Sequence, residues 1–268
     1  MEEEIIAFDK LLNLSGKSAV VTGGAGGIGL GIVTRLAQAG VKVLIADMDE
    51  ATAQKSVADL SAQDLTVKSI KCDVSNDEDV KQMVQTAVSE FGGLDILVNN
   101  AGIFPNAPLA KMTKEDFDRV IAVNLRGVFL CTETAGKQMI SQGRGGKIIN
   151  ITSIDAIHPS MIGLAHYDAS KHGVWGFTKN VALELAEHKI WVNAIAPGGI
   201  ATPGVAKMSQ GANAEAQKKM TEAFLARIPM GRMGVPDDIG KVALFMASEM
   251  SSYMTGEQIV VDGGALLM

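Results

Sequence analysis

Seven short runs of apolar and β-branched residues recur along the chain, separated by longer segments with helical periodicity. The runs are almost continuously hydrophobic, as strands are when helices cover both faces of a parallel sheet. Their alternation with helices predicts a doubly wound α/β fold, in which a seven-stranded parallel sheet is flanked by helices on both faces. The expected strands are Ala19–Thr22, Val41–Ala46, Thr66–Ile70, Ile96–Asn99, Lys147–Ile151, Trp191–Ile195 and Gln258–Val261.

Boundary signals agree with this pattern. Thr113 and Asp116 have the spacing of a capping box at a helix start. Pro236 suits the first turn of a later helix, where a missing N–H costs nothing, and Gly40 predicts the end of the first helix. The chain shows no linker, repeat or low-complexity tract. We therefore expect one domain over residues 1–268, with residues 1–14 as an N-terminal extension.

Composition excludes several classes of function. The formal net charge is −6 and the basic residues are scattered, whereas a nucleic-acid-binding protein usually carries a basic face. The acidic start does not fit a signal peptide, and the longest uncharged stretch contains prolines and glycines that do not fit a membrane span. Two distant cysteines, Cys72 and Cys131, fit a reducing compartment. We expect a cytoplasmic protein without nucleic-acid or membrane partners.

A glycine-rich loop joins the first expected strand to the first helix. Glycines let the backbone turn tightly and approach a pyrophosphate, whose charge is stabilised by the unpaired N–H groups at the helix start. The cluster alone is a weak signal, because the chain has 29 glycines and many of them mark turns. Its place between a strand and a helix strengthens it, and it predicts a dinucleotide site of Rossmann type. The predicted cofactor-binding residues of the loop are Gly23, Gly26, Gly27, Ile28 and Gly29.

An acid follows the second expected strand. Asp47 stands eighteen residues after Gly29, where a carboxylate can accept hydrogen bonds from the adenosine ribose and would repel a 2′-phosphate. Neither the glycine loop nor Met48 and Asp49 supplies a basic side chain to neutralise such a phosphate. These residues predict NAD (NADH) rather than NADP, with Asp47 and Met48 in the adenosine site. A solvated carboxylate at a strand end is the alternative interpretation of Asp47.

The chain after about residue 14 resembles the short-chain dehydrogenase/reductase family, because the loop has the form Thr-Gly-x-x-x-Gly-x-Gly and further motifs follow in the family's order. The resemblance implies that Asp73 contacts the adenine amino group, that Asn100 shapes the cofactor floor, and that Ile200 and Thr202 contact the nicotinamide carboxamide. Without the family, Asp73 also fits a helix cap and the later Pro-Gly pair an ordinary turn. The cofactor-site residues that the resemblance adds are Asp73, Val74, Asn100, Ala101, Gly102, Pro197, Gly198, Ile200 and Thr202.

Tyr167 and Lys171 are four residues apart on a helical segment, so their side chains lie on one helix face. A free phenol has a pKa near ~10 and is a weak base at neutral pH, but a neighbouring ammonium stabilises the phenolate. We therefore expect Lys171 to lower the pKa of Tyr167 by about two to three units, into the range useful for proton transfer. Ser153 follows the fifth strand, and its hydroxyl can hold the substrate oxygen beside the phenol. A Tyr-x-x-x-Lys match alone is more often a surface pair.

The family resemblance assigns roles to these residues. Ser153, Tyr167 and Lys171 match the family's catalytic triad, and Tyr167 and Lys171 also belong to its cofactor site. Asn124 resembles the fourth catalytic member, which holds a water that passes protons from the lysine to solvent; alternatively, it satisfies a buried carbonyl within a helix. Ser153 and Tyr167 are fourteen residues apart, one more than the usual family interval, and we place the extra residue in the loop at 158–163.

Other candidate groups are rejected. Strand alternation places Thr152 on the opposite face from Ser153. His158 and His166 are expected to line the pocket or contact a loop rather than act as general bases. The four histidines have no spacing typical of metal ligands, so we expect no metal.

The resemblance also places a substrate lid at about residues 203–233. Methionines in this segment can repack around an irregular apolar ligand, although an amphipathic helix gives much the same pattern. We expect a mainly apolar secondary alcohol or ketone. The apolar residues on which this expectation rests are Met208, Met220, Phe224, Leu225, Met230 and Met233.

The sequence thus predicts an NAD(H)-dependent oxidoreductase that interconverts a secondary alcohol and a ketone by hydride transfer, with Tyr167 as general acid/base. An NADP-dependent 3-oxoacyl carrier-protein reductase and a non-catalytic NAD-sensing regulator on the same fold are the alternatives. Asp47 counts against the first alternative, and the Tyr–Lys pair counts against the second. The segment Val260–Gly264 resembles the family's last strand, which usually packs against another subunit and so implies a homotetramer or homodimer.

Overall fold

The seven strands of the computed structural model are all parallel and form one sheet, as predicted. The structure describes residues 5–208, 222 and 224–268. The strand order is β3-β2-β1-β4-β5-β6-β7, so the chain builds outward from β1 in one direction and then from β4 in the other. Each predicted strand is confirmed, with its ends within two residues of the expected ones. The strands are β1 Ser18–Thr22, β2 Lys42–Asp47, β3 Val67–Lys71, β4 Ile96–Asn99, β5 Gly146–Ile151, β6 Ile190–Pro197 and β7 Gln258–Val261.

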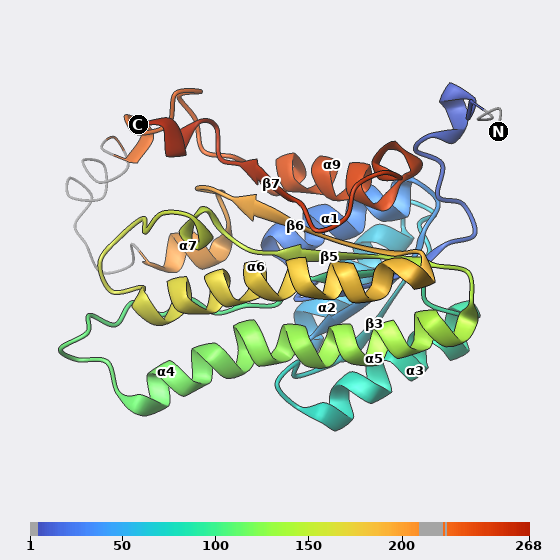
Figure 1. The fold of residues 1–268 in the computed structure, drawn as a ribbon, viewed down its shortest axis with the longest axis horizontal. Coiled ribbons are helices and arrows are strands. Elements are labelled where there is room, and N and C mark those ends of the chain that lie inside the picture. The colour runs from blue at the N-terminus through green and yellow to red at the C-terminus, as the bar shows by residue number, and fades with distance from the viewer. Residues whose placement is uncertain (1–4, 209–221, 223) are drawn as a thin grey trace.

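Helices connect the strands and cover both faces of the sheet (Figure 1). A π-helical turn, Ala122–Arg126, joins α4 to α5. The α-helices are α1 Gly27–Gln38, α2 Glu50–Ser61, α3 Asp77–Phe91, α4 Lys114–Ile121, α5 Gly127–Gln142, α6 Ala165–Leu185, α7 Pro203–Met208 and α9 Pro236–Ala247. Short 3-10 helices span Phe8–Lys10, Ile154–Ala156, Ala186–His188, Glu249–Ser251 and Ala265–Leu267.

The helix boundaries follow the predicted signals. The side chains of Thr113 and Asp116 each bond the other's backbone N–H, which forms the capping box at the start of α4. Pro236 is the first residue of α9. Gly40, two residues after α1, has φ +89°, a left-handed conformation that glycine adopts without strain.

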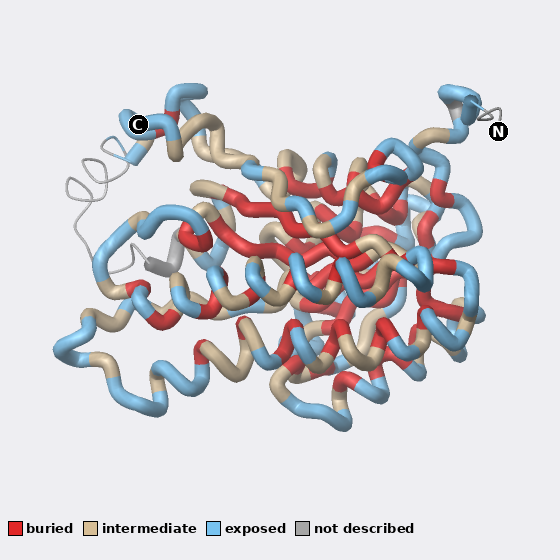
Figure 2. Tube along the Cα trace, in the orientation of Figure 1, coloured by how far each residue is buried: buried red, intermediate tan, exposed pale blue. Residues whose placement is uncertain are grey.

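Two apolar cores lie on opposite faces of the sheet. One face packs against α1, α2 and α9, and the other against α3, α5 and α6. Figure 2 shows the buried residues concentrated in the strands and on the inner sides of the helices. Because both faces of the strands are covered, their residues are apolar almost without interruption, which explains the pattern of the sequence.

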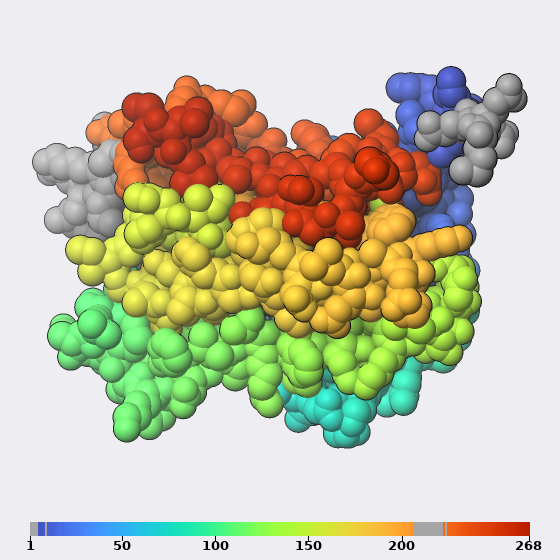
Figure 3. Space-filling model, viewed as in Figure 1, coloured from blue at the N-terminus to red at the C-terminus, as the bar shows by residue number. Residues whose placement is uncertain are grey.

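Parallel strands bring their carboxyl ends to one edge of the sheet. The order reverses between β1 and β4, and such a switch point at the carboxyl edge is where α/β proteins commonly bind ligands. Helix α7 and the C-terminal residues lie at this end of the molecule (Figure 1). There the backbone N–H of Met230 donates to the carbonyl of Gly263 at 3.1 Å, and Figure 3 shows these two segments against each other.

The N-terminal extension carries the 3-10 helix Phe8–Lys10, in which Phe8 is exposed, and it reaches the first core through buried Leu14. Across residues 5–208, 222 and 224–268, no helix has the length and apolar character needed to cross a bilayer.

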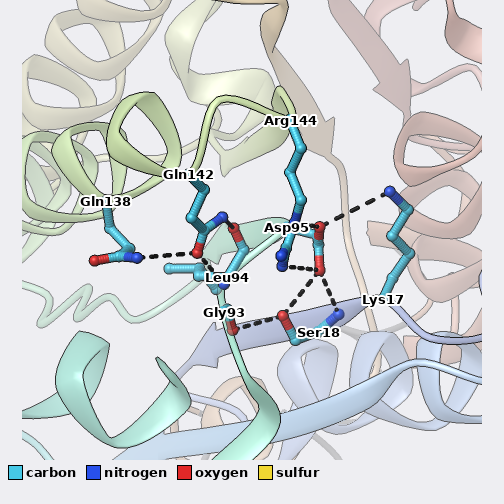
Figure 4. Close-up of polar contacts among 8 residues, drawn as sticks. All are labelled: Lys17, Ser18, Gly93, Leu94, Asp95, Gln138, Gln142 and Arg144. Atoms are coloured by element: carbon cyan, nitrogen blue, oxygen red, sulfur yellow. Dashed lines mark hydrogen bonds and ion pairs between the residues drawn. The ribbon is translucent and has the colours of Figure 1, made fainter. Parts of the chain in front are cut away.

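An ion network around the buried carboxylate of Asp95 lies at the opposite, amino edge of the sheet (Figure 4). Asp95, just before β4, accepts hydrogen bonds from the backbone N–H and the hydroxyl of Ser18, at 2.9 and 3.0 Å. Arg144, before β5, donates to the same carboxylate at 2.8 Å, and the Lys17 ammonium lies 3.8 Å from it. Burial opposes ionisation, but the donors from Arg144 and Ser18 outweigh it and hold the pKa of Asp95 below its usual value. Asp95 therefore ties β1, β4 and β5 together.

We predict that Asp95→Asn lowers the free energy of unfolding by about 2 kcal/mol at neutral pH, because it removes charge-assisted hydrogen bonds. A lowered folded-state pKa stabilises the fold above the unfolded-state value of about 4, and this contribution disappears as the pH falls through the folded-state pKa. Urea unfolding at pH 7 and in acid should show that the difference between variant and parent shrinks in acid. Asp59→Asn, at an exposed position on α2, is the control. An equal loss in both variants would contradict the prediction.

Candidate active site

The glycine loop has no space for a side chain at Gly29 but has open space at Gly26. A Cβ on Gly29 would lie 2.1 Å from the carbonyl oxygen of Gly23, so only glycine fits there. A Cβ on Gly26 would meet no atom within 4 Å, and Gly26 is the N-cap of α1 without a side chain that caps the helix. Unpaired N–H groups at a helix start, beneath open space, form a cradle that fits a pyrophosphate.

Asp47 is anchored to this loop. Its carboxylate accepts hydrogen bonds from the backbone N–H of Ala25 at 3.0 Å and from that of Asp49, also at 3.0 Å. The acid at the end of β2 is therefore held against the glycine loop, and its place in the adenosine site stays a prediction. Met48 beside it is 62% exposed, which leaves its side chain accessible to an adenosine.

The loop after β4 is tied to the loop after β1. The Asn100 amide donates to the carbonyls of Thr22 and Gly23, both at 2.9 Å. The Thr22 hydroxyl accepts from the backbone N–H groups of Asn100 and Ala101, both at 3.0 Å. A Cβ on Gly102 would lie 3.7 Å from the Lys171 ammonium nitrogen, so this loop passes directly beside the lysine.

The Pro-Gly segment at the end of β6 also lies at the carboxyl edge of the sheet. Gly198 donates to the carbonyl of Val261 at 3.0 Å, which continues the pairing of β6 with β7. Ile200 is buried and forms a β-bridge with Gly234. A Cβ on Gly27 would lie 3.5 Å from the Thr202 Cβ, so Thr202 stands beside the start of α1.

Asp73 and Val74, which are predicted for the adenine end of the cofactor, follow β3. The Asp73 carboxylate accepts hydrogen bonds from the backbone N–H and the hydroxyl of Ser75, at 2.9 and 2.7 Å. Asn76, rather than Asp73, caps α3, so the interpretation of Asp73 as a helix cap is wrong. Val74 is buried against Gly127, the first residue of α5. The contact of Asp73 with adenine stays a prediction.

Tyr167 and Lys171 share one face of α6, as predicted. The Lys171 ammonium nitrogen lies 5.5 Å from the centre of the Tyr167 ring and donates to the carbonyl of Ile151, at the end of β5, at 2.7 Å. Phe104, from the loop after β4, packs edge-to-face on Tyr167 with 6.0 Å between ring centres. Lys171 is only 4% exposed, so the pair belongs to the interior of the site and not to the surface.

The expected direction of the Tyr167 pKa is wrong for the chain by itself. Burial raises the pKa of Tyr167 above its usual value, and the charges of Asp155 and Asp168 raise it further; the hydrogen bond with Ser153 acts in the opposite direction. Burial also lowers the pKa of Lys171 to about 8, against a smaller opposing effect of Asp155. Desolvation of the phenolate is therefore the largest influence on the pKa of Tyr167.

Ser153 lies where β5 ends. Its hydroxyl donates to Asp155 at 2.8 Å and accepts from the Asp155 backbone N–H at 3.1 Å, so Ser153 caps the 3-10 helix Ile154–Ala156. Thr152 is directed elsewhere, because its hydroxyl bonds the carbonyl of Ile195 at 2.9 Å and the Gln258 side chain at 2.7 Å. Strand alternation thus separates the two hydroxyls as predicted. Sequence reasoning missed Asp155, although an acid two residues after the serine was the available signal.

Asn124 lies in the π-helical turn and is fully buried. Its amide donates to the carbonyl of Ile103 at 2.8 Å and accepts from the N–H of the same residue at 2.8 Å. It also donates to the Ser170 hydroxyl at 3.1 Å. The side chain therefore satisfies a buried backbone segment, which is the alternative raised from the sequence, and the proton-relay role stays a prediction.

The histidines near the site do not contact its reacting groups. His158 is exposed in the loop, and buried His166 accepts a hydrogen bond from the backbone N–H of Tyr167 at 3.0 Å. In the described part of the chain, no three His, Cys, Asp or Glu side chains are grouped so that they could hold a metal ion.

Part of the expected lid lies outside the described residues, including Met220 and the side chain of Met208. In the remainder, Phe224 is 40% exposed and lies against Gly199, Met230 is 66% exposed, and Met233 is half-buried.

Comparison with known proteins agrees with this geometry. Residues 23–265 match a family model described as enoyl-(acyl carrier protein) reductase. A 3-oxoacyl-[acyl-carrier-protein] reductase FabG of Thermotoga maritima is 40% identical over 256 residues, which cover 96% of this chain and 100% of that protein. The chain belongs to the short-chain dehydrogenase/reductase family. A 3beta-hydroxysteroid dehydrogenase 2 of Eggerthella lenta is 38% identical, with 94% of this chain and 95% of that protein covered.

Solved structures of this family have the same fold. A short-chain type dehydrogenase/reductase from Mycobacterium marinum superposes with a TM-score of 0.89 and 36% identity, covering 97% of this chain and 99% of that one. A putative 2-deoxy-d-gluconate 3-dehydrogenase from Agrobacterium tumefaciens, with bound NADP, has a TM-score of 0.86 and 34% identity, covering 96% and 99%. This family member is thus an oxidoreductase that acts on hydroxyl or keto groups and uses a nicotinamide dinucleotide.

The glycine loop allows a matched test. We predict that Gly29→Ala lowers the free energy of unfolding by about 1–3 kcal/mol, because its methyl group would overlap the Gly23 carbonyl. Gly26→Ala should leave thermal unfolding unchanged and weaken NADH binding, because its methyl group enters the open space over the helix start. Melting curves and NADH fluorescence titrations measure the two effects. Wild-type NADH affinity in Gly26→Ala would show that the pyrophosphate does not lie there.

Proposed function

We propose that this protein is an NAD(H)-dependent dehydrogenase/reductase that interconverts a secondary alcohol and a ketone, with Tyr167 as general acid/base. The observation that carries the proposal is the convergence of Ser153, Tyr167 and Lys171 at the carboxyl edge of the sheet. Ser153 acts to lower the pKa of the phenol, and the buried ammonium lies 5.5 Å from the ring. These groups face the loop of Gly102, next to the cradle at the start of α1.

Each group has a distinct task in this mechanism. A bound oxidised nicotinamide would supply the hydride acceptor for the alcohol carbon and a positive charge near the phenol. Tyr167 takes the hydroxyl proton of the alcohol, or returns a proton to the ketone oxygen in the reverse direction. Ser153 holds the same oxygen, and Lys171 favours the phenolate electrostatically while the Ile151 carbonyl fixes its ammonium group. Asn124 is the proposed holder of a water between Lys171 and solvent.

The preference for NAD rests on Asp47. Its carboxylate is held by backbone N–H groups at the edge of the cradle, where a 2′-phosphate would meet an unneutralised negative charge. The remaining cofactor contacts are proposed for the loops of Asp73, Asn100 and Thr202, which lie at the carboxyl edge of the sheet.

The 3-oxoacyl carrier-protein reductase is the second candidate, because the relative from Thermotoga maritima carries that name and one solved relative holds NADP. Asp47 and the absence of Lys or Arg at Met48, Asp49 and in the glycine loop count against it. A non-catalytic NAD sensor is disfavoured, because such a protein has no need to bury a lysine beside a tyrosine.

Apolar side chains at the entrance favour an apolar substrate. Phe104 lies on the Tyr167 ring, and a Cβ on Gly204 would lie 3.3 Å from Phe104, so this ring stands between the reacting phenol and the start of α7. Met230 and Phe224 are exposed on the same carboxyl-edge side. We propose a mainly apolar alcohol or ketone as the substrate class.

We further propose that the whole chain acts as one domain in a cytoplasmic homotetramer or homodimer. Strand β7 is the last strand of the sheet, and Val260 on it is 39% exposed, which suits an edge that packs against a second subunit. The two cysteines are buried free thiols, consistent with a reducing compartment.

Tyr167→Phe should abolish turnover, with a loss of at least about 100-fold, while NADH binding is retained. Because the pKa of Tyr167 is raised, oxidation of the alcohol should accelerate with increasing pH as phenolate forms. A screen of cyclic alcohols, steroids, hydroxyacyl thioesters and polyols with NAD at alkaline pH provides the assay. Tyr253→Phe is the matched control, because Tyr253 is fully exposed and is the only other tyrosine of the chain. Full turnover in Tyr167→Phe would refute the mechanism.

Asp47→Asn should raise the affinity for NADPH relative to NADH by about tenfold, because it removes the charge that repels a 2′-phosphate while keeping an oxygen for the Ala25 N–H. Dissociation constants from fluorescence titration measure this ratio. Asp49→Asn removes an equal charge from the adjacent cap of α2 and should change the ratio far less. Equal or tighter binding of NADPH by the unsubstituted protein would overturn the NAD assignment.

A further inference from the structure

A buried carboxylate stands directly behind the Ser153 hydroxyl. Asp155 is 5% exposed and lies in the 3-10 helix that follows β5. One carboxylate oxygen accepts a hydrogen bond from the Ser153 hydroxyl at 2.8 Å, and the other accepts one from the backbone N–H of Ser160, also at 2.8 Å. The mechanism above gives Asp155 no task, although it is the group to which the serine is bonded.

These contacts fix the direction of the serine proton. A hydroxyl has one hydrogen to donate and two lone pairs that accept. Ser153 donates its hydrogen to Asp155 and uses one lone pair for the Asp155 N–H. With its hydrogen held by Asp155, the Ser153 oxygen has only its remaining lone pair to offer, so it can accept from a phenol or alcohol O–H but cannot donate to a phenolate.

We propose that Asp155 is a positioning residue that holds the Ser153 hydrogen, so that the serine oxygen meets the phenol or an alcohol O–H as an acceptor. The inference rests on the proposed function, because it concerns the same serine and tyrosine. In this arrangement Ser153 accepts the O–H of an alcohol only until Tyr167 takes that hydrogen, after which the serine hydroxyl must donate to the alcohol oxygen. A ketone has no hydrogen to give, so it requires the serine hydroxyl to turn away from Asp155 and donate.

The surrounding charges support the assignment. Among the carboxylates near Tyr167, Asp155 and Asp168 both act to raise the pKa of the phenol, but only Asp155 bonds Ser153. Lys171 is the cation beside the ring, and Asp168 is itself influenced by His166 and His172 on the same helix. Asp168 therefore provides a comparison for the effect of charge without the serine.

The test needs no substrate. Tyr253→Phe leaves Tyr167 as the only tyrosine, so ultraviolet tyrosinate absorbance reports its ionisation alone. The absorbance is read after a jump to alkaline pH, before the chain can unfold. Asp155→Asn should lower the pH midpoint of tyrosinate formation by about one to two pH units, because it removes a charge and frees the serine hydrogen to turn to the phenolate. Asp155→Glu, which keeps the charge, should shift this midpoint far less than Asp155→Asn does.

The role of the serine is isolated by measuring Asp155→Asn and Asp168→Asn both in the parent protein and together with Ser153→Ala. The shift caused by Asp155→Asn should become smaller there, because only the effect of charge remains, whereas the shift caused by Asp168→Asn should be the same with and without Ser153. Equal shifts from Asp155→Asn in both backgrounds, or no shift at all, would overturn the proposal. Circular dichroism verifies folding, and Asp155→Ser replaces the Asn variant if the latter does not fold.

Failure of this inference is distinguishable from failure of the proposed function. If Tyr167→Phe keeps full turnover, the proposed function is wrong whatever the titration gives. If Tyr167→Phe is inactive and Asp155→Asn shows no shift that depends on Ser153, only the positioning role of Asp155 is refuted.

Discussion

The parallel direction of all seven strands is the constraint on which the rest of the structure depends. The loops proposed for the cofactor and Ser153 follow the carboxyl ends of strands, and only parallel pairing brings those ends to one edge. The bonds of Asn100 to Thr22 and Gly23 then join the loops on the two sides of the point where the strand order reverses. At the opposite edge, the buried carboxylate of Asp95 holds three strands together by hydrogen bonds.

The reacting centre shows a competition between burial and charge. Burial disfavours both charged forms, the phenolate of Tyr167 and the ammonium of Lys171. It therefore raises the pKa of Tyr167 and lowers that of Lys171, and both changes favour the neutral groups. The charge of Asp155 raises the pKa of Tyr167, as burial does, and also raises the pKa of Lys171, against the effect of burial. A positive charge brought by the oxidised cofactor acts on the phenol in the opposite sense to Asp155. The protonation state of the site is therefore set jointly by the chain and by what it binds.

The relatives differ in the substrates that their names specify, among them an acyl-carrier-protein reductase and a hydroxysteroid dehydrogenase, although they match nearly the whole chain. The cradle of α1, the loop of Asn100 and the Tyr–Lys pair are fixed by the sheet. Phe104, Phe224 and Met230 lie on segments outside the sheet, where changes cost little stability. We infer that these segments select the substrate, while the sheet fixes the geometry of the Tyr–Lys pair.

The sequence by itself determined the strands, the helix boundaries, the glycine loop and the pairing of Tyr167 with Lys171, because these depend on local periodicity and spacing along the chain. It could not decide the direction of the Tyr167 pKa, since desolvation depends on what the fold packs around the ring. Nor could it show that Asp155 holds the Ser153 hydrogen or that Asp47 bonds the glycine loop. Only the tertiary structure decides such contacts, because they require distances between groups whose orientation the local sequence leaves free.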